Sequence, residues 1–105
     1  MEIHDARFAC ERRLAGRWRV YDSIECLLRD TGESPGGAAW LADYDGRSLH
    51  AADSMWIAQG EFPSPMGGGY AAFLDSAAAG DVAGASSGSV ARLAELLAAA
   101  REEAP

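Results

Sequence analysis

The chain has 105 residues, of which 49% are hydrophobic, and a formal net charge of −7 at pH 7. This length is typical of one compact domain, and the acidic balance argues against binding DNA or RNA through phosphates, which requires a basic face. No apolar run approaches the roughly eighteen residues that a membrane-spanning helix needs, so no such helix is predicted.

The first half of the chain predicts a β-hairpin, a helix and a third strand. The predicted strands share apolar–polar alternation and cover residues 6–14, 17–21 and 38–44. Arg12 is a polar exception on the apolar face of the first strand, and residues 15–16 supply the hairpin turn. Asp22 and Ser23 offer the N-cap of the helix, and Glu25 falls three residues after Asp22 in a capping-box pattern. The helix should end near Gly32, which suits a left-handed C-terminal position.

The second half predicts a similar succession of elements. The predicted strands cover residues 55–59, 70–74 and 89–93, and the predicted helices cover residues 77–85 and 94–103. Asp75 and Ser76 open the first of these helices. Gly80 and Gly84 interrupt this helix, so we expect it to be small and to pack closely on the sheet. Residues 48–54 are ambiguous, with a short helical turn expected at Ala51 and Ala52.

An internal repeat is indicated, because RVYDSIECLL and AFLDSAAAGD both lead from a strand through Asp-Ser into a helix. The predicted fold class is therefore α+β with a mainly antiparallel sheet. It comprises two strand-strand-helix-strand (ββαβ) units and a C-terminal helix. The chain is expected to form a single domain over residues 1–105, with halves at 1–44 and 54–93.

Residue patterns for catalysis are weak. Neither His4 nor His50 lies near a nucleophile motif, and the acidic residues are scattered over turns and helix starts. We therefore expect no enzymatic activity. Cys10 and Cys26 fit neither a Cys-x-x-Cys pair nor a zinc signature, and one disulfide between them stays open.

Metal binding is the remaining chemical option. Thioethers and thiolates select soft ions, above all Cu(I), and the chain has three methionines and two cysteines. Met66 stands between the rigid Pro65 and three glycines, which would allow its thioether to be presented at the mouth of a site. The alternative is that Met66 fills an irregular gap at the edge of the core, as methionines often do.

Four segments, in this order, resemble motifs of the NosL family of membrane-anchored copper chaperones that serve nitrous oxide reductase. They are MEIHDARFA at residues 1–9, YDSIECLL at 21–28, WLADY at 40–44 and PMGGGYAAF at 65–73. The last segment is the most specific. The family is similar to the metal-binding part of organomercurial lyases, and both use repeated ββαβ units. The family's Cys-containing head and lipoprotein leader are not present ahead of Met1.

The resemblance implies Cu(I) held by sulfur and nitrogen ligands. Met66 is the first expected ligand, followed by Met1, Cys26 and His4, whereas Cys10 is expected to pack in the core. The implied partner is a copper-receiving enzyme or transporter. The implied location is periplasmic or membrane-anchored through a leader missing here, with a cytoplasmic location expected if the chain is complete as given.

Two alternatives remain open. One is a metal-free module for partner binding or dimerisation that has lost the Cys head, in which the three tryptophans supply an exposed patch; these are Trp18, Trp40 and Trp56. The other is an organomercurial-lyase-like enzyme. Such an enzyme would need paired thiolates near an acid, and only Cys10 and Cys26 are available.

Overall fold

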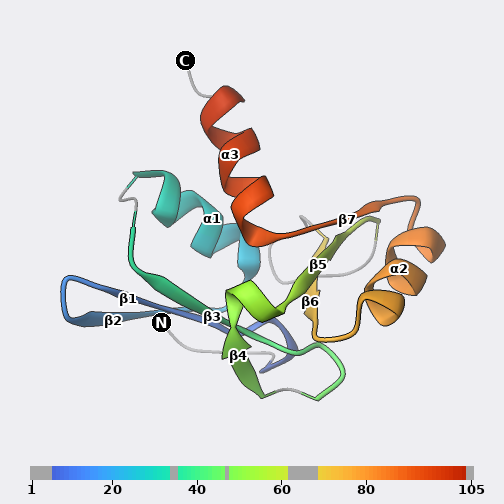
Figure 1. Ribbon diagram of the computed structural model, residues 1–105, viewed down its shortest axis with the longest axis horizontal. Helices are drawn as coiled ribbons and strands as arrows, with labels where there is room; N and C mark the ends of the chain where they lie inside the picture. The colour runs from blue at the N-terminus through green and yellow to red at the C-terminus, as the bar shows by residue number, and fades with distance from the viewer. Residues whose placement is uncertain (1–5, 34–35, 47, 62–68, 104–105) are drawn as a thin grey trace.

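The computed structural model describes residues 6–33, 36–46, 48–61 and 69–103, which form two antiparallel sheets with helices packed on them (Figure 1). The first sheet has the order β2-β1-β3-β4 and the second β6-β5-β7. The strands are β1 (Cys10–Leu14), β2 (Arg17–Tyr21), β3 (Ala38–Ala42), β4 (Leu49–Ala51), β5 (Trp56–Gln59), β6 (Tyr70–Phe73) and β7 (Ser89–Ala91). The α-helices are α1 (Ile24–Glu33), α2 (Ser76–Ala85) and α3 (Leu93–Glu103), and the 3-10 helices are η1 (Ala6–Phe8) and η2 (Ala52–Ser54).

The two sheets are built by the same chain path. In each, the first strand lies in the centre, the second pairs with it as a hairpin, and the third returns to its other side after a helix. The predicted fold class, α+β with two ββαβ units and a C-terminal helix, is thereby confirmed. Within the described residues, no helix has the length and apolar character needed to cross a membrane.

The first ββαβ unit refines its prediction in several local features. Residues 6–8 form the 3-10 helix η1, so the strand begins only at Cys10. Arg12 keeps the strand alternation and is buried, although it is charged. The cap of α1 is Ser23, whose Oγ accepts a hydrogen bond from the amide of Cys26 at 3.2 Å. The helix also continues past Gly32 to Glu33, and Gly32 does not adopt a left-handed conformation.

The second ββαβ unit follows its prediction more closely. Asp75 caps α2 by accepting a hydrogen bond from the amide of Ala77 at 2.9 Å. The helix packs on the second sheet through Ala79 and Ala83, which are buried. Its two glycines are exposed, so they do not form the packed face that the sequence suggested.

The larger of two buried hydrophobic clusters among the described residues is shared by the two units. It includes Leu41 of the first sheet together with Met55, Ile57 and Ala72 of the second unit. A backbone hydrogen bond also joins the two units, because the amide of Tyr44 donates to the carbonyl of Ala72 at 2.8 Å. Helices α1 and α3 contact each other, whereas α2 lies against the far end of the second sheet (Figure 1).

Candidate functional site

Three of the four residues expected to bind metal lie outside the described residues: Met1, His4 and Met66. The fourth, Cys26, is in the first turn of α1 and has a half-buried side chain. Its thiol is free and lies 3.8 Å from Oδ1 of Asp22, within range of a weak hydrogen bond to that carboxylate. Cys26 is thus a partly accessible sulfur at the start of a helix.

Cys10 is a free thiol of a different kind. It is fully buried at the start of β1, and its Sγ donates to the carbonyl of Phe8 at 3.4 Å. Burial raises the pKa of Cys10 far above its ordinary value, and the negative charges of Cys26, Asp22 and Glu25 raise it further. The Cys10 thiol therefore stays protonated, which makes it a poor metal ligand and disfavours a pair of thiolates with Cys26.

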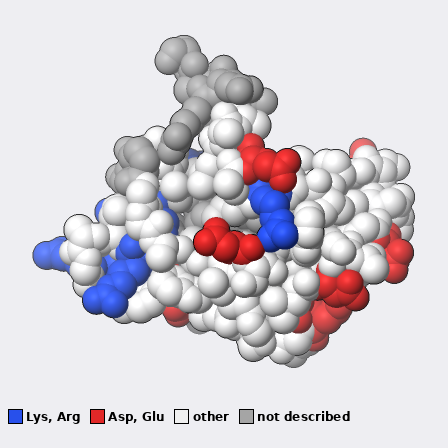
Figure 2. Space-filling view, in the orientation of Figure 1, with Lys and Arg blue, Asp and Glu red and all other residues white. Residues whose placement is uncertain are grey.

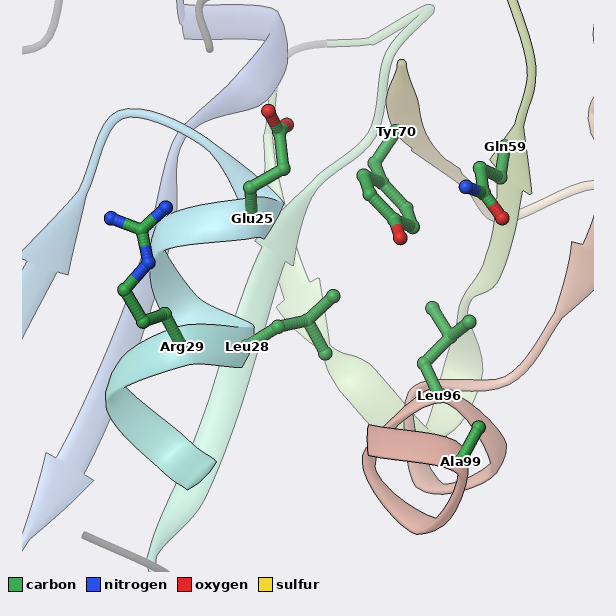
Figure 3. Close-up of a pocket in the computed structure, with 7 residues that line it drawn as sticks. All are labelled: Glu25, Leu28, Arg29, Gln59, Tyr70, Leu96 and Ala99. Atoms are coloured by element: carbon green, nitrogen blue, oxygen red, sulfur yellow. The ribbon is translucent and has the colours of Figure 1, made fainter. Parts of the chain in front are cut away.

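A cleft of about 480 Å³ lies between α1, α3 and the ends of β5 and β6 (Figure 3). Its lining includes Glu25, Leu28 and Arg29 of α1, Gln59 of β5, Tyr70 of β6 and Leu96 of α3. Leu28, Tyr70 and Leu96 point toward one another across the opening, whereas the guanidinium of Arg29 points away from it (Figure 3). Cys26 lies on the same helix but is not part of the lining, because neighbouring residues of an α-helix point about 100° apart.

The ends of the Met66 segment are fixed at this cleft. Gln59 pairs with Tyr70, and the amide of Gly60 donates to the carbonyl of Gly69 at 3.0 Å. Gly69 has a φ of 69°, and a Cβ there would lie only 1.9 Å from the carbonyl oxygen of Gly60. The close backbone approach therefore requires glycine at position 69. The described chain stops at Glu61 and resumes at Gly69, close to Gln59 and Tyr70, which line the cleft.

A complete set of metal ligands is not found among the described residues: no group of three or more His, Cys, Asp or Glu there could hold an ion. His50, the other histidine considered, lies on β4 with its Nε2 2.9 Å from Oγ of Ser48. Of the expected ligands, Cys26 alone lies within the described residues.

Sequence reasoning missed two features. The cleft escaped it because its lining comes from four elements, and only the β5–β6 register and the α1–α3 contact bring them together. It left open which tryptophans are exposed: Trp18 is 53% exposed, whereas Trp40 and Trp56 are half-buried. The sequence contained a signal for the exposure of Trp18. Trp18 alternates along β2 with the residues that face α1, so it lies on the other face of the sheet.

Comparisons of the chain with family models, with curated proteins and with solved structures gave no match.

Proposed function

We propose that this domain binds Cu(I) and delivers it to a copper-receiving enzyme or transporter. A respiratory copper enzyme such as nitrous oxide reductase would be one such receiver. The observation that carries the proposal is the placement of Cys26. Cys26 is a half-buried free thiol in the first turn of α1, and α1 also lines a cleft together with Gln59 and Tyr70, which flank the segment containing Met66. The motif resemblance supports the same ligands and a periplasmic or membrane-anchored setting.

The proposed chemistry follows from ligand type. Cu(I) prefers thiolate and thioether ligands, and Cys26 with Met66 would provide one of each. Met1 and His4 are the further proposed ligands. A small number of ligands leaves a coordination position open, so a ligand of the receiving protein can attack and take the ion by exchange. No general acid or base is needed, which agrees with a carrier rather than an enzyme.

The test is a Cu(I) titration of the reduced protein in competition with a chromogenic chelator. The wild type should compete, and Cys26→Ser and Met66→Leu should each weaken Cu(I) affinity by roughly tenfold or more. Deletion of residues 1–4 tests Met1 and His4 together and should also weaken binding.

The chain offers matched controls for both sulfur types. Met55 is fully buried in the core, and Cys10 is a buried thiol of raised pKa. Met55→Leu and Cys10→Ala should leave Cu(I) affinity unchanged in the folded protein, with folding checked by circular dichroism. Failure of the wild type to compete, or equal losses in Met55→Leu and Met66→Leu, would contradict the proposal.

A further inference from the structure

The outer strand of the first sheet has an open edge. Strand β2 pairs with β1 alone among the described residues, and it lies at the end of the order β2-β1-β3-β4. Every second residue of such a strand directs its backbone N–H and C=O away from the sheet, where another strand can bind. The β1–β2 hairpin extends outward from the body of the molecule (Figure 1), so this edge is accessible to a partner.

The side chains of β2 differ between the two faces of the sheet. Trp18 and Val20 lie on the face away from α1 and are 53% and 39% exposed. Arg17 and Arg19 alternate with them and are also exposed. Arg19 faces α1, because its guanidinium donates to both carboxylate oxygens of Asp30 at 2.8 and 2.9 Å. The strand therefore presents an apolar face, and on the other face it presents Arg17 and the Arg19–Asp30 ion pair.

The apolar face of the edge is held in place by neighbouring rings and charge. The Trp18 ring lies 5.1 Å from that of Trp40 on β3, and the guanidinium of Arg13 lies 5.7 Å from the Trp18 ring centre. Such contacts restrict the rotamers of Trp18 and lower the entropy that binding must remove. An exposed tryptophan that is already ordered is a typical anchor of a protein interface.

The charge of this edge is opposite to that of the whole protein. The chain carries 16 acidic and 9 basic residues, yet Figure 2 shows basic side chains gathered over the β1–β2 hairpin. They include Arg13, Arg17 and Arg19. A basic patch on an acidic protein attracts acidic partners and repels basic ones at that place.

These features select one class of partner. A second copy paired through β2 in a register centred on Arg19 would put like charges opposite each other, which destabilises a strand pair. A strand added to the edge contacts both faces at once, because its own side chains alternate.

We propose that the open edge of β2 binds an extended segment of another protein in which acidic and apolar residues alternate. The acidic side chains would lie on the face of Arg17, and the apolar ones beside Trp18 and Val20. This inference is independent of the copper proposal, because no sulfur ligand takes part in it.

The test uses metal-free protein and a labelled, end-capped peptide that alternates Glu with Val, with binding followed by fluorescence anisotropy. The alternating peptide should bind, and a scrambled peptide of equal composition should bind less. Arg17→Gln and Trp18→Ser should each weaken binding by about three- to tenfold. Ala77→Glu, which changes the net charge by the same amount as Arg17→Gln but lies on α2, should leave binding unchanged.

A second peptide tests strand addition itself. N-methylation of alternate residues removes the backbone donors that an added strand needs, so the methylated peptide should not bind. Equal binding of the methylated and unmethylated peptides would overturn the proposal, as would unchanged affinity in Arg17→Gln. Binding to vesicles of phosphatidylglycerol but not to the peptide would also overturn it, and would indicate a membrane surface instead.

Discussion

At the scale of single residues, Arg12 shows how the fold accommodates a charge that the sequence pattern placed on an apolar face. Its side chain is 1% exposed, its Nη1 donates to Oγ1 of Thr31 at 2.5 Å, and Asp30 lies 3.9 Å away. Hydrogen bonds from Tyr21 and Arg19 lower the pKa of Asp30, which keeps its carboxylate charged. The buried guanidinium is thus paired, as a buried charge must be.

Thr31 supplies the acceptor closest to this buried charge, and it also donates to the carbonyl of Leu27 at 2.7 Å. Thr31→Val keeps the side-chain shape but removes the acceptor. We expect the free energy of unfolding to fall by about 1–3 kcal/mol, because a buried charged donor loses a partner. Urea denaturation followed by circular dichroism measures the change. Thr31→Ser keeps the hydroxyl and should lose less, and equal losses in the two variants would argue for packing as the cause.

At the scale of elements, strand alternation and cap residues predicted most of the fold, and tertiary pairing decided the rest. Asp75 caps α2 as expected, because its local sequence offers one clear cap. Asp22 and Ser23 are both good caps, and the structure uses Ser23, whereas the Asp22 carboxylate lies near the Cys26 thiol. Cys26 could be placed on a helix from sequence, but the cleft that this helix lines depends on Gln59 meeting Tyr70, which no local pattern specifies.

The glycines of α2 give a prediction at this scale. A Cβ built on Gly80 or Gly84 would meet no atom within 4 Å, and both lie inside a helix, so they carry the entropic cost of glycine without a packing reason. Gly80→Ala and Gly84→Ala should each raise the free energy of unfolding by about 0.4–1 kcal/mol in thermal or urea denaturation. Gly88→Ala is the contrast: its Cβ would lie 1.6 Å from the carbonyl oxygen of Gln59, and it should strongly destabilise the protein.

At the scale of the whole molecule, the chain repeats one unit twice, but the main hydrophobic cluster contains residues of both units. Leu41 is fully buried and packs in one cluster with Met55, Ile57 and Ala72 of the other unit. The hydrogen bond from Tyr44 to Ala72 joins the sheets at the same place. Neither unit can therefore lose its structure without exposing apolar surface of the other, which favours one cooperative transition.

Leu41→Ala tests this shared core. Removing a buried leucine side chain should lower the free energy of unfolding by about 2–5 kcal/mol. Hydrogen exchange of amides in β1 and in β5 should accelerate to the same extent, because both strands open through global unfolding. Leu74→Ala, at a position that is 42% exposed in the second unit, should cost little. If Leu41→Ala accelerated exchange in β1 and left β5 protected, the two units would be separate folding units and the shared core would not couple them.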